Sequence, residues 1–146
     1  MRLALVSLVF GLTACAAPDQ PQPRPLPAND DLYQQLGELA GITRIVEEML
    51  LNISEDQRIV HHFAETDIDR LNAKLIEQLC VESGGPCTYT GDTMADSHAG
   101  MGVTEGDFNA LVENLQKAMD THGVPTAAQN RLLARLAPMR EDVIYR

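Results

Sequence analysis

A single histidine in a glycine-rich turn is the residue of this sequence best suited to bind a metal. His98 is followed by glycines at positions 100 and 102, and a capping sequence that begins at Thr104 then starts a strongly amphipathic helix. Neutral imidazole is a common metal ligand. His98 could therefore ligate a metal from the turn while the helix behind it supplies an apolar wall.

Two of the three cysteines, Cys80 and Cys87, stand close together in the sequence. The segment between them holds Gly84, Gly85 and Pro86, which favour the turn that would bring the two sulfurs together. A metal site is the competing interpretation, but two thiols without a third Cys or a nearby His are too few for structural zinc. We therefore predict a Cys80–Cys87 disulfide, which an oxidising compartment would permit.

The first fourteen residues have the features of a signal peptide. Arg2 precedes an almost wholly apolar run from Leu3 to Leu12, which is too short to span a membrane as a helix. The sequence Leu-Thr-Ala-Cys at positions 12–15 resembles a bacterial lipobox, which implies cleavage before Cys15 and lipidation of that residue. The alternative is an ordinary secretory signal with an incidental cysteine.

Residues 15–30 are predicted to tether a domain to that lipid. Five of these residues are prolines, which favour an extended and semi-rigid chain. Position 16 is Ala, and the absence of Asp after the cysteine resembles the sorting pattern of outer-membrane lipoproteins. We therefore expect a lipid-anchored protein at the periplasmic face of a bacterial cell envelope, in the outer membrane.

The composition limits the classes of partner. The chain has 146 residues, of which 45% are hydrophobic, and this is enough for one domain with its own core. The formal net charge is −10, which argues against nucleic acid as a partner because phosphate binding needs a basic face. The same charge argues against a polybasic contact with a membrane.

From residue 31 onward the apolar residues recur with helical spacing, and no segment alternates convincingly with the period of a strand. The sequence therefore predicts an all-α fold. Capping boxes are expected at residues 66–69 and 104–107, a helix stop at residues 84–86, and a kink at Pro138 in the last helix. Residues 81–103 are glycine-rich and irregular, and so long a segment in a compact domain is usually functional or disordered.

Several short motifs, in this order and at this spacing, resemble those of group I truncated haemoglobins. The resemblance runs from about Leu32 to Val143, which is nearly the whole domain after the tether. It rests on residues 32–37, Phe63, the segment 70–74, the Gly-Gly-Pro-x-x-Tyr-x-Gly loop at 84–91, and Met94 with His98 four residues later. It implies a truncated 2-over-2 globin over residues 31–146, with a long irregular loop before and around the proximal histidine.

The resemblance also implies haem b, with iron bound by His98. Haem needs an axial imidazole, an apolar slot and a cation at its rim. Phe63 would pack against the porphyrin, Leu71 would lie over the iron, and Lys74 would lie near a propionate. Further residues expected to line the slot are Leu75, Leu79, Met94, Met101, Phe108, Leu111 and Val143.

Departures from the family pattern bear on function. Many members have a tyrosine where this chain has Leu50, and a glutamine that often completes the distal network is Leu75 here. With Leu71, these residues predict a wholly apolar distal pocket. A donor to bound oxygen contributes on the order of 1–3 kcal/mol, so its absence should speed oxygen release and autoxidation. The usual glycine pair of the first turn is also incomplete, because Glu38 follows the first glycine.

The sequence leaves three functions open. The first is reversible binding of O₂, NO or CO, for O₂ carriage or for NO detoxification by an NO dioxygenase-like activity that would need an electron donor. The second is a six-coordinate redox or electron-transfer haem protein, in which Lys74 or a mobile histidine takes the other axial site. The third is a haem-free interaction lipoprotein. His61 and His62 are expected at the surface, with the alternative that either lines the mouth of the pocket, and His122 is expected to stabilise a helix end.

Overall fold

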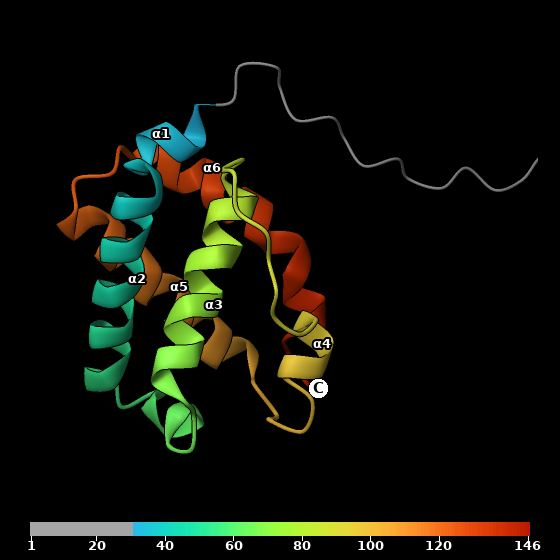
Figure 1. Ribbon diagram of the computed structural model, residues 1–146. Coiled ribbons are helices and arrows are strands. Elements are labelled where there is room, and N and C mark those ends of the chain that lie inside the picture. The colour runs from blue at the N-terminus through green and yellow to red at the C-terminus, as the bar shows by residue number, and fades with distance from the viewer. Residues whose placement is uncertain (1–30) are drawn as a thin grey trace, which may run out of the picture.

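The computed structural model describes residues 31–146, and the expected all-α fold is confirmed over that range (Figure 1). The proposed signal peptide, the tether and Cys15 lie outside the described residues. In chain order the elements are α1 (Leu32–Gln35), α2 (Glu38–Glu55), the 3₁₀ turn η1 (Val60–Phe63), α3 (Ile68–Glu82), α4 (Met94–Ser97), α5 (Glu105–Thr121), α6 (Thr126–Leu136) and the 3₁₀ segment η2 (Ala137–Asp142). None of the helices in the described range is long and apolar enough to cross a membrane.

Helix α2 is the centre of the core. It packs against α5 and α3, and α3 lies beside it in Figure 1 while α5 crosses behind. Its apolar residues recur at steps of three and four, so one face of the helix is buried. The buried apolar residues of that face are Ile42, Ile45, Val46, Met49 and Ile53.

Side-chain caps define where α3 and α5 begin. The Thr104 side chain accepts from the Asp107 amide and the Asp107 carboxylate accepts from the Thr104 amide, so the second predicted capping box is confirmed. The first is wrong: α3 is capped by Asp67, which accepts from the Arg70 amide, and not by Thr66. Asp is as good an N-cap as Thr, and local backbone geometry decided between two adjacent candidates.

Pro138 does not kink the last helix as expected. Helix α6 ends at Leu136, and Pro138 lies in the first turn of η2. A proline lacks the amide that would continue the α-helical hydrogen bonding, so the chain passes into a tighter 3₁₀ segment instead.

Residues 83–104 form the irregular segment, and α4 is the helix it contains. It runs from the end of α3 back along that helix to α4 (Figure 1). Cys80 of α3 and Cys87 of the segment form a disulfide with a Cα–Cα distance of 5.8 Å. A Cβ at Gly85 would collide with the Tyr33 ring and with the Cys80 sulfur, so glycine is required at this turn.

The turn between α1 and α2 has two consecutive residues with positive φ. Gly37 has a φ of 82° and Glu38 a φ of 56°. Glycine adopts this left-handed conformation readily, whereas an L-residue with a side chain adopts it at a cost. The incomplete glycine pair thus leaves the left-handed turn in place, with a glutamate in the second position.

Candidate functional site

His98 is presented by the end of α4, and a backbone contact fixes its tautomer. Its Nδ1 lies 2.7 Å from the carbonyl oxygen of Met94. A carbonyl oxygen only accepts hydrogen bonds, so Nδ1 carries the proton and donates. The lone pair of Nε2 is then available to a metal, as in metal-ligating histidines whose other ring nitrogen is held by a carbonyl group.

Three cavities meet at His98. Two have volumes of about 370 Å³ each and the third about 60 Å³. The two larger cavities lie between α3, α4, α5 and the buried face of α2, and six residues line both: Met49, Leu75, Gln78, Met94, His98 and Leu111. An imidazole with a free nitrogen therefore stands at the boundary of a largely apolar space large enough for a sizeable ligand.

The structure brings the predicted slot residues together, although they come from four elements, η1, α3, α4 and α5, and from the segments that follow α4 and η2. Phe63, Leu71 and Lys74 line the first large cavity, and Phe108, Leu79 and Val143 line the second. Met101 lines the small cavity, which also includes His98. Each residue expected at the slot therefore borders at least one of the three cavities, and all three share His98 and Leu111.

Leu50 is the exception among the expected distal residues. It packs against the core and is not among the residues that line the three cavities. Met49 lines both large cavities and Ile53 lines the first, so α2 contributes these two residues to the space. Successive side chains of a helix point in directions that differ by about 100°. When Met49 faces the cavity, the side chain of Leu50 therefore points elsewhere.

The site also contains a polar side chain that the sequence analysis missed. Gln78 of α3 lines both large cavities. It follows Leu75 by three residues, and residues at this spacing lie on the same face of a helix. The sequence therefore did indicate that Gln78 would lie beside Leu75. The expectation of a wholly apolar distal pocket is corrected by this amide, which lines the cavity that Leu71 and Leu75 also line.

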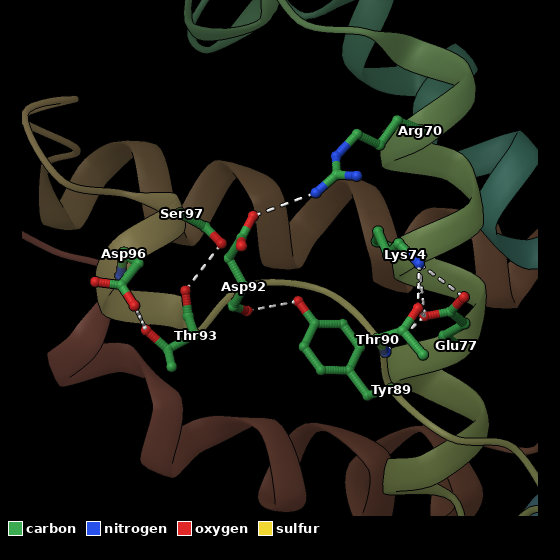
Figure 2. Close-up of polar contacts among 9 residues, drawn as sticks. All are labelled: Arg70, Lys74, Glu77, Tyr89, Thr90, Asp92, Thr93, Asp96 and Ser97. Atoms are coloured by element: carbon green, nitrogen blue, oxygen red, sulfur yellow. Dashed lines mark hydrogen bonds and ion pairs between the residues drawn. The ribbon is translucent and has the colours of Figure 1, made fainter.

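Lys74 lies at the rim, where it already has anionic and hydroxyl partners (Figure 2). Its Nζ lies 2.9 Å from Glu77 Oε1 and also contacts the Thr90 hydroxyl. Glu77 further accepts from the Thr90 amide at 2.9 Å. The lysine hydrogen bond, followed by the Thr90 amide, lowers the pKa of Glu77 to about 2. Lys74 therefore helps fasten the irregular segment to α3, and its pairing with a propionate stays a prediction.

A second link between α3 and the segment is an exposed ion pair. Arg70 Nη2 is 3.3 Å from Asp92 Oδ2, and the two side chains are 59% and 66% exposed. The Tyr89 hydroxyl donates to the Asp92 carbonyl at 2.9 Å, and burial raises the pKa of Tyr89. A Cβ at Gly91 would collide with that hydroxyl, so the loop closes this tightly only with glycine there. Arg70 is thus a rim cation with a more solvated partner than Lys74 has.

Of the paired histidines, the structure partly buries one and exposes the other. His61 is exposed, whereas the His62 side chain is 14% exposed and lines the small cavity with His98. His62 Nε2 is 3.3 Å from Asp107 Oδ2, but its direction does not meet hydrogen-bond geometry. The expectation of surface exposure is therefore wrong for His62.

Comparison with known proteins agrees with this arrangement. Residues 31–145 match the family model of the bacterial-like globins. The chain is 28% identical over 112 residues to a group 1 truncated hemoglobin of Mycolicibacterium paratuberculosis, covering 77% of this chain and 82% of the relative. The crystal structure of Tetrahymena pyriformis truncated hemoglobin in its Fe(III) form superposes with a TM-score of 0.76 at 28% identity, covering 79% of this chain and 98% of that one. A 2/2 hemoglobin from Synechococcus, at 24% identity and a TM-score of 0.73, has the same fold.

Proposed function

This chain belongs to the bacterial-like globin family, and on that premise we propose that it is a truncated haemoglobin that binds haem b through Nε2 of His98. The observation that carries the proposal is the His98–Met94 contact of 2.7 Å, which leaves Nε2 as the free ring nitrogen of an imidazole that borders all three cavities. The apolar lining fits a porphyrin, and the rim cations Arg70 and Lys74 fit its carboxylates.

The proposed activity is reversible binding of a diatomic gas, O₂, NO or CO. Haem held by His98 would supply an iron that binds such a gas. Leu71 and Leu75 of α3 and Met49 of α2 contribute apolar side chains to the lining of the first cavity. These three side chains offer no hydrogen-bond donor, and the Gln78 amide that also lines this cavity donates to the sulfur atoms of Met94 and Met139. The site therefore suits rapid exchange of O₂ or reaction with NO better than tight storage of O₂.

The test is a set of absorption spectra of purified protein in the ferric, ferrous and CO-bound states. A high-spin ferric spectrum and a CO adduct formed on mixing would support gas binding. A low-spin ferric spectrum would favour the electron-transfer alternative, in which a second side chain binds the iron. For that role Lys74 would have to leave Glu77 and Thr90, which argues against it. Protein that stays colourless after expression with ample haem would refute the proposal.

The location and further partners are also proposals. We propose that a lipid on Cys15 anchors the domain at the periplasmic side of the outer membrane, and that a separate electron donor returns the iron to the ferrous state. The lipobox-like sequence at positions 12–15 supports the anchor. Cys15→Ser should abolish labelling by radioactive palmitate and move the protein to the soluble fraction. An unchanged membrane fraction would refute the anchor.

A further inference from the structure

Gln78 is the one amide side chain among the residues lining both large cavities, and nothing proposed so far uses it. It is partly buried, and Leu71 and Leu75 lie on the same face of α3. An amide is costly to place in apolar surroundings unless its donors find acceptors. What the Gln78 amide contacts therefore bears on its role.

The acceptors of the Gln78 amide are two sulfur atoms on different elements. Its Nε2 lies 3.4 Å from Met94 Sδ and 3.3 Å from Met139 Sδ. Met94 begins α4 and Met139 belongs to η2, so one amide joins α3, α4 and η2 at a single point. Thioether sulfur is a weak acceptor, but each contact also requires the methionine to keep one side-chain conformation.

Met94 is also the residue that holds His98. Its carbonyl oxygen accepts from His98 Nδ1 at 2.7 Å, and its side chain is the one Gln78 contacts. Helix α4 has four residues and packs against η2, so few contacts set its place. A shift of Met94 would move both the carbonyl oxygen and the imidazole.

We infer that Gln78 is a positioning residue for the axial ligand, which acts through Met94 to hold the His98 imidazole in one orientation and one tautomer. The inference rests on the proposed ligation of haem iron by His98. A helix on one side of the cavity thus sets the geometry of the ligand on the other side. The role depends on the N–H donor of Gln78 and not on its volume alone.

The first experiment replaces the donor while keeping the side-chain size. In Gln78→Met, we expect the iron–histidine stretching band of the ferrous protein, measured by resonance Raman, to shift and broaden. Haem loss to an acceptor protein should be roughly two- to fivefold faster, as for a contact of modest coupling. Gln78→Leu gives the same test if the methionine variant fails to fold. A band and a rate identical to wild type in the folded variant would overturn the inference.

A double-mutant cycle separates positioning through Met94 from general packing. Met94→Leu removes the sulfur that faces Gln78 but keeps the backbone carbonyl. If Gln78 acts through that sulfur, the band shift of the double variant should be no larger than that of Met94→Leu alone. Met139→Leu removes the other sulfur and should shift the band less. Additive shifts, or an equal shift from Met139→Leu, would contradict the inference.

A measurement without haem distinguishes this inference from the proposed function. Nitrogen-15 NMR of the full chain, as purified without haem, should show His98 protonated at Nδ1 in wild type and a mixture of tautomers in Gln78→Met. If wild type binds no haem but shows this difference, the proposed function fails and the positioning role stands. If haem binds and the tautomer does not change in the variant, the positioning role fails.

Discussion

The two sides of the cavity are built in different ways. The α3 side, formed by Leu71, Leu75 and Gln78, is one face of a regular 15-residue helix that packs against α2. The opposite side, residues 83–104, is irregular, and its place depends on the disulfide, on side-chain contacts to α3 and on a four-residue helix. His98 stands on this irregular side. The segment that carries His98 is therefore positioned by individual contacts, most of which connect it to α3.

The sharpest test of this difference removes the ligand from the irregular side. We expect His98→Ala to abolish stable haem incorporation and to leave the protein largely helical, because the core around α2 does not include His98. Haem content from the pyridine haemochrome assay and helicity from far-ultraviolet circular dichroism are the measurements. His122→Ala, which changes an exposed histidine at the end of α5, is the control. If His98→Ala kept its full haem content and an unchanged spectrum, the irregular side would not carry the haem ligand.

The second prediction concerns the covalent link between the sides. Removing the disulfide by Cys80→Ser with Cys87→Ser should lower the free energy of unfolding by about 2–3 kcal/mol, the chain-entropy value for so short a loop. Haem affinity should change little, since neither cysteine lines the three cavities. Thermal unfolding and haem titration test the two parts. Two alkylated thiols in unreduced, exported wild-type protein would show that the link does not form there.

The third prediction acts on the regular side. Leu75→Gln places an amide donor on the face of α3 that lines both cavities, so O₂ release from the ferrous protein should slow by roughly tenfold, or about 1.4 kcal/mol. Release of CO should change much less, because bound CO is less polar. Stopped-flow dissociation of both gases gives the comparison. Leu50→Tyr is the matched control, and we expect little effect because Leu50 does not line the cavities. Slower O₂ release from Leu50→Tyr would show that Leu50 reaches the bound gas.

The smallest expected effect concerns the contacts of Glu77 with Lys74 and, second, with the Thr90 amide. The pKa of Glu77 is lowered to about 2 in the folded protein, so the folded state favours its charged form. That stabilisation is present above the usual glutamate pKa of about 4.3 and is lost as the pH falls from there toward 2. Glu77→Gln should therefore flatten the fall in stability over this range in urea unfolding. Glu47→Gln, an exposed carboxylate of α2, should keep the wild-type profile. An unchanged profile in Glu77→Gln would mean that these contacts contribute no stability.

The apolar face of the regular side was predicted from the helical spacing of its residues. The role of the irregular side was predicted only from the resemblance to a known family. Helical spacing marked Leu71, Leu75 and Leu79 as one apolar face, and the structure places all three at the cavities. For His98, local spacing indicated only a histidine in a turn, and the order of the motifs supplied its expected role. The Lys74–Glu77 pair was readable from its i, i+3 spacing, but Thr90 comes from a distant part of the chain.

Two errors at the site have simple physical causes. The sequence predicted Leu50 at the cavity, but the structure has Met49 there. The two residues are adjacent in α2 and both are apolar, so the spacing of apolar residues does not show which of them faces the cavity. Gln78 was missed because a polar residue on a helix is ordinarily assigned to solvent. Its two sulfur partners come from α4 and η2, and no local pattern connects those segments.

The left-handed pair Gly37 and Glu38 has a consequence for how this domain could evolve. A single-base change turns a glutamate codon into a glycine codon, so Glu38→Gly is within one mutational step. The change would remove the cost of the left-handed conformation at position 38, but glycine also has more conformational freedom in the unfolded chain. The net increase in the free energy of unfolding should be about 0.5–1 kcal/mol. The turn is remote in sequence from His98 and does not border the cavities. It therefore offers a reserve of stability that could offset destabilising changes elsewhere, such as new polar groups inside the gas-binding space.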